Sequence, residues 1–223
     1  MSIRSIPEKT AEILFNRFML QSFRHREVAI YAPSTAEEAR NGYDPKLFGM
    51  KQFREIYLQF KAPTYSEKKR HLLVRFIPEQ HALLKVYRPK TAFYVCPMFS
   101  AYADLVTAQK RVRNTLDFLR HFLVIDASIL PKDVYSLYYS IPSSHRQSPD
   151  AVYKCTSSAG SESLRREDCL LGNQLIQKFK KDEIGSVVLL GKEPDVHMGW
   201  LLWTVEDCRA SSFGSYIRKP LKK

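Results

Sequence analysis

The stretch that decides the fold is GYDPKLFGMKQFREIYLQFK, residues 42–61. Its second half, residues 55–61, combines apolar and β-favouring residues and predicts a strand, which Pro63 ends. Asp44 follows Gly42 on a turn that leads into this strand region. The stretch therefore predicts an acid on a loop, outside the core, just ahead of an apolar strand.

Two polar residues stand at the far end of that predicted strand. Because side chains alternate along a strand, Gln59 and Lys61 share one face, and Leu58 and Phe60 share the other. An amide and an ammonium two residues apart are unusual in an apolar core. Lys61 is therefore interpreted either as a catalytic cation or as an exposed surface charge.

A short helix is predicted upstream, over residues 34–41. Ser34 and Glu37 have the spacing of a capping box, and Gly42 ends the helix. Glu37 thus has a structural role, whereas Glu38 has none and becomes a candidate ligand.

The rest of the chain mixes helices and strands, so the fold class is predicted to be α/β, with α+β as the alternative. Further helices are expected over residues 8–23, 78–87, 102–123 and 169–181, and further strands over 28–31, 71–77, 92–96, 134–141 and 186–190. Residues 142–163 are rich in Ser, Pro and Gly and predict a surface loop. Residues 1–141 are interpreted as an α/β core, and 142–223 as a loop with a β-rich extension of the same domain.

The charge is strongly basic. The 223 residues hold 35 Lys and Arg against 23 Asp and Glu, a net charge of +12. A polyanion such as nucleic acid is the partner that this favours, although a solvated cationic surface is the alternative. The candidate contacts come from the segment 62–123, where the excess is concentrated: Lys68, Lys69, Arg70, Lys110, Arg111 and Arg113.

Several classes of protein are excluded or disfavoured. No apolar stretch approaches the ~18 residues that a membrane span requires. The N-terminal residues lack the apolar segment of an export signal. The four cysteines are scattered and predict free thiols in a reducing compartment, so a cytoplasmic location is expected.

The ordered set Glu38, Asp44, Gln59 and Lys61 suits phosphodiester hydrolysis. Hard oxygen ligands hold Mg²⁺, with Mn²⁺ as a substitute, and Glu38 and Asp44 are the predicted metal ligands. Gln59 offers a neutral carbonyl oxygen. Lys61 is the predicted catalytic cation, because a positive charge offsets the charge that builds on the phosphate.

Over residues 34–99 this order resembles the PD-(D/E)xK nuclease superfamily, whose fold is that of restriction endonucleases. The resemblance rests on Gly42-Tyr43-Asp44 and on Leu58-Gln59-Phe60-Lys61, with Gln59 in the place of the usual acid and Pro45 after the Asp instead of before it. It implies Mg²⁺-dependent cleavage of double-stranded DNA, in restriction or antiphage defence, by a chain that acts with a protein partner or as a homodimer. In some branches the following helix adds a Gln to the site, and Gln80 is the candidate here.

Two other functions stay open. The chain could be a non-catalytic nucleic-acid-binding or adaptor subunit with a degenerate nuclease-like fold. It could also be a protein-interaction module that binds no nucleic acid, with Lys61 as a surface charge.

Overall fold

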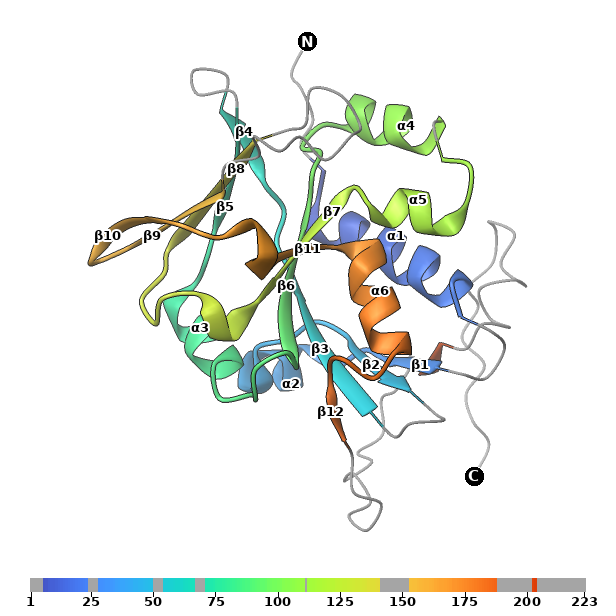
Figure 1. Ribbon diagram of the computed structural model, residues 1–223, viewed down its shortest axis with the longest axis horizontal. Coiled ribbons are helices and arrows are strands. Elements are labelled where there is room, and N and C mark those ends of the chain that lie inside the picture. Colours follow the sequence, from blue (N-terminus) through green and yellow to red (C-terminus); the bar gives the residue numbers. More distant parts are fainter. Residues whose placement is uncertain are drawn as a thin grey trace.

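The computed structural model describes residues 6–23, 28–49, 54–66, 71–110, 112–140, 153–187 and 202–203. These residues form a mixed α/β structure with two β-sheets, as Figure 1 shows, which confirms the predicted fold class. No helix among them is long and apolar enough to cross a lipid bilayer.

Six α-helices lie in the described part of the chain. They are α1 (Glu8–Gln21), α2 (Thr35–Asn41), α3 (Pro78–Leu84), α4 (Tyr102–Lys110), α5 (Thr115–Leu119) and α6 (Gly172–Lys180), with single 3₁₀ turns η1 (Ala127–Ile129) and η2 (Arg166–Asp168). The capping box of α2 is confirmed: Ser34 N donates to Glu37 Oε2 at 2.9 Å, and Glu37 N donates to Ser34 Oγ at 3.4 Å.

The main sheet has the strand order β11-β7-β6-β3-β2-β1-β13, and β12 also pairs with β3. Its strands are β1 (Val28–Tyr31), β2 (Lys46–Gly49), β3 (Arg54–Phe60), β6 (Ala92–Pro97), β7 (Phe122–Asp126), β11 (Cys169–Leu171), β12 (Ser186–Val187) and β13 (Leu202–Trp203). Neighbours are antiparallel except β3 and β6, which run parallel because α3 crosses between them.

The second sheet is antiparallel, in the order β10-β9-β8-β5-β4. Its strands are β4 (Thr64–Ser66), β5 (His71–Arg75), β8 (Ser136–Ser140), β9 (Tyr153–Ser157) and β10 (Gly160–Ser163). β4 and β5 are inserted between β3 and α3, whereas β8 to β10 lie between β7 and β11. The chain therefore enters and leaves this sheet twice.

Two sequence predictions are wrong at these places. The loop expected over residues 142–163 is a hairpin, β9–β10, in its described part, because β9 finds a ladder partner in β8. The helical region expected over 102–123 ends at Leu119, and β7 begins at Phe122. The run Phe122–Ile125 is fully buried, as the apolar run of a central strand is.

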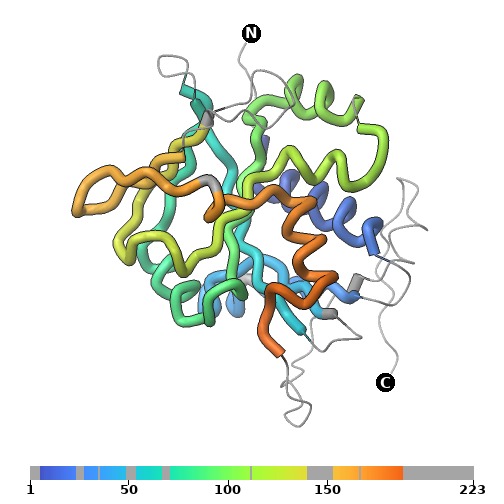
Figure 2. The backbone as a smooth tube through the Cα atoms, in the orientation of Figure 1, coloured from blue at the N-terminus to red at the C-terminus, as the bar shows by residue number. Residues whose placement is uncertain are grey.

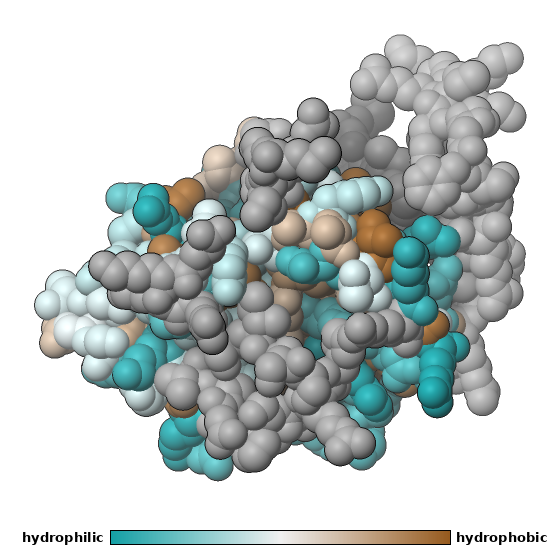
Figure 3. Space-filling model, turned by 90° about the horizontal axis from the view of Figure 1, so that it is seen from above, coloured by the Kyte–Doolittle hydropathy of each residue, from teal (hydrophilic) through white to brown (hydrophobic). Residues whose placement is uncertain are grey.

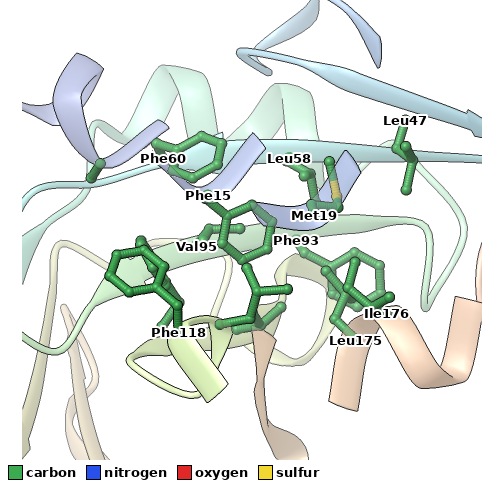
Figure 4. Packing of buried hydrophobic residues seen from close by; sticks show 14 of the residues in the cluster. Phe15, Met19, Leu47, Leu58, Phe60, Phe93, Val95, Phe118, Leu175 and Ile176 are labelled. Carbon is green, nitrogen blue, oxygen red and sulfur yellow. The ribbon is translucent and has the colours of Figure 1, made fainter. Parts of the chain in front are cut away.

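The main sheet separates two hydrophobic cores. Helices α1, α5 and α6 cover one face, where Phe15 meets the rings of Phe60 and Phe122 edge-to-face at centroid distances of 5.5 and 5.1 Å. Figure 4 shows this core from close by. The second sheet covers the other face with its own apolar side, including Leu72 and Leu137.

Helices from the two halves of the described chain meet in the first core. Figure 2 shows α1 and α6 on the same side of the main sheet, although they are far apart in the sequence. Gly172, at the start of α6, lies so close to Phe15 that an added Cβ would come within 2.8 Å of its ring. The described residues beyond 142 also add strands to both sheets.

Candidate active site

Asp44 lies on the turn between α2 and β2, and its side chain points into the sheet. Phe60 N donates to Asp44 Oδ2 at 2.6 Å, and Asp44 N donates to Leu58 O at 2.9 Å. The residue is only 9% exposed. The prediction that Asp44 stands outside the core is therefore wrong, because backbone bonds to β3 draw its carboxyl inward.

Gln59 is fully buried beside Asp44. Its Nε2 donates to Asp44 Oδ2 at 2.8 Å and to Phe60 O at 3.1 Å. Its Oε1 accepts from Gln80 Nε2 at 2.8 Å, and Gln80 comes from the first turn of α3. The three polar residues thus form one hydrogen-bonded chain that joins the turn, the central strand and the crossover helix.

Gly42 fixes the turn against α3. It ends α2 with a left-handed φ of 77°, and its N–H donates to Glu38 O at 2.7 Å. A Cβ there would lie 2.9 Å from Leu83 Cβ and 3.1 Å from Gln80 O. Only glycine accepts both the conformation and this close approach, and so the turn that carries Asp44 is held against α3.

Glu38 adds a second carboxyl to this group. Burial raises the pKa of Asp44 to about 8, despite the lowering effect of the Phe60 N–H, and a hydrogen bond with Glu38 and its negative charge raise it as well. A buried carboxyl with a raised pKa next to a second carboxyl is typical of a cation or proton-transfer site.

Glu12 is the acid that sequence analysis missed. It is 7% exposed on α1; burial raises its pKa, Lys9 lowers it, and Glu38 and Glu8 raise it. Its negative charge also raises the pKa of Asp44. The signal in the sequence was its position, three residues before Phe15 on the apolar face of the helix.

Lys61 is buried, and the alternative of an exposed surface charge is wrong. The residue is 8% exposed, because its N–H continues the β3–β6 ladder to Val95 O at 3.1 Å. Its ammonium lies 3.6 Å from Glu8 Oε1, and Glu8 Oε2 accepts from Ala62 N at 3.2 Å. This ion pair ties Lys61 to the first turn of α1.

The residue types fit a divalent cation. Asp44 and Glu38 bring two carboxyl groups into hydrogen-bond contact, and Gln80 Oε1 is buried without a hydrogen-bond partner among the described residues. In the described part of the chain, no three Asp, Glu, His or Cys side chains form a complete metal-binding group. Two carboxylates suffice for Mg²⁺, which keeps several waters and takes phosphate oxygens as further ligands.

The predicted nucleic-acid contacts are only partly described. Lys110, at the end of α4, and Arg113, after it, are exposed. Lys68, Lys69, Arg70 and Arg111 lie outside the described residues. From above, the described surface is mostly hydrophilic, with small hydrophobic areas separated from one another (Figure 3).

Comparisons with known proteins add no relative. No family model matches the chain, and neither the curated proteins nor the solved structures contain a significant match.

Proposed function

We propose that the protein is a metal-dependent nuclease that hydrolyses phosphodiester bonds in double-stranded DNA. The observation that carries the proposal is the contact between the Asp44 carboxyl, which is buried beside Gln59, and the half-buried Glu38. Natural folds avoid burying like charges unless they are paired or bind a cation, because the desolvation cost is large.

The order of elements supports the same proposal. β2 and β3 are antiparallel, α3 crosses to β6, and β6 lies parallel to β3. Asp44 precedes β2, and Gln59 and Lys61 stand at the end of β3. This order is similar to the one that the resemblance to PD-(D/E)xK nucleases implies, with two departures: Asp44 lies before β2 instead of on a strand, and β4 and β5 are inserted between β3 and α3.

Each residue has a role in the proposed chemistry. Asp44 and Glu38 would hold Mg²⁺ or Mn²⁺, and a bound cation of this kind polarises a phosphoryl oxygen and lowers the pKa of its water. Gln59 and the Phe60 N–H orient the Asp44 carboxylate, and Gln80 orients Gln59. Lys61 supplies a partly desolvated positive charge for the phosphate in the transition state.

The cellular setting is part of the proposal. Cys96, Cys155 and Cys169 are free thiols, which supports a reducing compartment such as the cytoplasm. A role in restriction or antiphage defence rests on the resemblance alone.

One observation favours the non-catalytic alternative. Both polar atoms of Gln59 are engaged inside the protein, since Nε2 donates to Asp44 and Oε1 accepts from Gln80. If the Gln59 amide serves only to make hydrogen bonds inside the protein, the site is that of a degenerate copy that binds nucleic acid without cleaving it.

The test is cleavage of supercoiled and linear duplex DNA with Mg²⁺ or Mn²⁺, with EDTA as the blank. Asp44→Asn should abolish cleavage, because the amide is a far weaker metal ligand than the carboxylate. The matched control is Glu37→Gln, one residue from Glu38, which should weaken the helix cap by about 1 kcal/mol or less and alter the bond from Tyr31 OH.

Folding and chemistry are separated by a melting curve in EDTA. In the Asp44→Asn variant, the new amide can still accept from Gln59 and Phe60 through its oxygen and can donate to Glu38 through its nitrogen. Asp44→Asn should therefore melt at or above the wild-type temperature while losing cleavage. Robust cleavage by Asp44→Asn would rule out this site.

A further inference from the structure

The second sheet has an outer face that points away from the main sheet. Across it, cross-strand partners form a row of residues from all five strands: Thr64, Leu73, Tyr138, Lys154 and Ser163. Cross-strand partners stand side by side about 5 Å apart on the same face. A second row runs beside it through Arg75, Ser136 and Thr156.

The two faces of this sheet differ in kind. The inner face buries Leu72, Val74, Leu137 and Tyr139 against the main sheet. On the outer face, Thr64, Arg75 and Lys154 are exposed, and Leu73 and Tyr138 are half-buried. At the end formed by the β9–β10 hairpin, on the left of Figures 1 and 3, the surface is hydrophilic to near neutral.

The charge of the outer face is of one sign. The outward positions of the five strands carry Arg75 and Lys154 and no acid, and in the described part of the chain neither cation pairs with a carboxylate. The remaining outward positions are mostly Ser and Thr. Ser136 among them is buried, whereas Thr64, Ser161 and Ser163 are exposed, and their hydroxyls can donate to phosphate and sugar oxygens. Such a face complements a polyanion.

Two aromatic side chains share this outer face with the cations. His71 and Tyr138 come from adjacent strands and meet edge-to-face, with centroids 5.6 Å apart and planes at 88°. Lys154 stands opposite Tyr138 in the register. Cations and aromatic rings on the same face of a sheet can bind backbone phosphates and stack unpaired bases.

We propose that this outer face binds single-stranded nucleic acid, with Arg75 and Lys154 on phosphates and a base stacked on the Tyr138–His71 pair. The inference goes beyond the proposed cleavage, because binding here needs no metal and no catalytic residue. The face is nevertheless close to the candidate site along the chain: β4 begins three residues after Lys61, a span of at most about 11 Å.

Fluorescence anisotropy with labelled 20-nucleotide dT and U strands, and with a duplex of equal length, tests the inference in EDTA. Wild type should bind a single strand more tightly than the duplex. Tyr138→Ala should weaken single-strand binding at least about fivefold, the lower range for loss of a stacked base, while Tyr138→Phe should keep it. The two strands distinguish DNA from RNA.

Lys154→Glu is the second variant, because an exposed strand position tolerates it even if Tyr138→Ala fails to fold. It should weaken binding and lower the slope of log affinity against log salt by about 0.7, the share of one phosphate contact. The matched control is Lys181→Glu, an exposed lysine after α6 on the opposite side of the main sheet, which should leave binding unchanged.

The outcomes separate this inference from the proposed function. Two results together support single-strand binding by the outer face, even if no cleavage is observed. Asp44→Asn binds single strands as tightly as wild type, and Lys154→Glu binds them more weakly. Cleavage of duplex DNA without single-strand binding overturns the face alone. The inference is also overturned if duplex and single strand bind with equal affinity and neither Tyr138→Ala nor Lys154→Glu changes that affinity.

Discussion

The Gln59 amide nitrogen lies 2.8 Å from Asp44 Oδ2, so a neutral donor occupies the place beside the carboxyl where the nuclease motif that the sequence resembles has a second acid. In the protein without metal, this donor lowers the cost of burying Asp44, because it satisfies an oxygen that would otherwise face a like charge. Compared with an acid at the same place, Gln59 gives the site one negative charge less and makes it more stable when no metal is bound.

Gln59→Glu should add the negative charge and remove the hydrogen-bond donor. It replaces the donor with a carboxyl 2.8 Å from Asp44 Oδ2, and so it should destabilise the protein in EDTA by about 2 kcal/mol or more. Melting curves with and without Mg²⁺ measure this. The variant should gain more stability from Mg²⁺ than wild type does; an equal gain would argue against a cation at Asp44. Gln174→Glu, at the start of α6, is a control far from the site.

Lys61→Met should test the catalytic charge without emptying the space that the lysine stem fills. We expect cleavage to fall ~100-fold or more, the scale of one lost charge in a preorganised site. Stability should change by less than about 1 kcal/mol, since the Glu8 partner is partly exposed and can be hydrated. Duplex affinity should persist, because one contact among many is a small share of binding.

Lys61→Ala is the contrasting variant. It removes a side chain that is 8% exposed, so it should cost about 1–3 kcal/mol of stability as well as activity. Comparable cleavage by Lys61→Met and wild type, with Lys61→Ala impaired only through unfolding, would show that the lysine is structural.

Exposed cations near the end of α4 should contribute to duplex binding through phosphates. Each lost contact lowers the slope of log affinity against log salt by about 0.9, so Lys110→Ala with Arg113→Ala should lower it by about 1.8. Titrations between low and moderate salt measure the slope. Lys181→Ala, after α6, controls for net charge. A slope that the double variant leaves unchanged would remove these residues from the interface.

His81 should make the fold sensitive to mild acid. Its Nε2 lies 2.9 Å from Pro131 O, which can only accept, so Nε2 carries the proton and Nδ1 accepts from Tyr94 OH at 3.1 Å. Burial lowers its pKa in the folded state, the bond to Pro131 opposes this, and Lys85 lowers it as well.

The sign follows from linkage. The unfolded chain binds a proton near the ordinary pKa of about 6.5, whereas folded His81 resists it. Stability should therefore be full above that value and decline as the pH falls toward the lower folded pKa. Denaturant titrations from pH 8 to pH 5 should show the decline, and His81→Gln should flatten it over that interval. An identical decline in the variant would assign it to other groups.

The sequence predicted the local features of the site and missed those that depend on distant contacts. The capping box left Glu38 available, and alternation placed Gln59 on a face with Lys61; both are near-neighbour properties. Glu12 and Glu8 were missed as partners, since nothing in α1 reveals which strand it will cover. Burial of Asp44 was missed for the same reason. The residues of its turn are typical of an exposed loop, and its burial depends on hydrogen bonds to the backbone of Phe60 and Leu58, which are distant in the sequence.

The fold shows the same division. Helix α2 and strand β3 could be predicted from caps and alternation, because those patterns act within a few residues. Strands β7 and β9 could not. β7 follows a helix without a turn signal, and β9 becomes a strand because β8 offers it an edge.

The double passage of the chain between the two sheets has a consequence for cooperativity. Because β4–β5 interrupt the main sheet and β8–β10 return before its last strands, no single cut divides the molecule into one part per sheet. We therefore expect that neither sheet folds independently. The helix layer also combines α1, from the beginning of the described chain, with α6, from near its end. Calorimetry should accordingly record one transition, and truncation after β8 should yield an unfolded chain in place of a smaller domain.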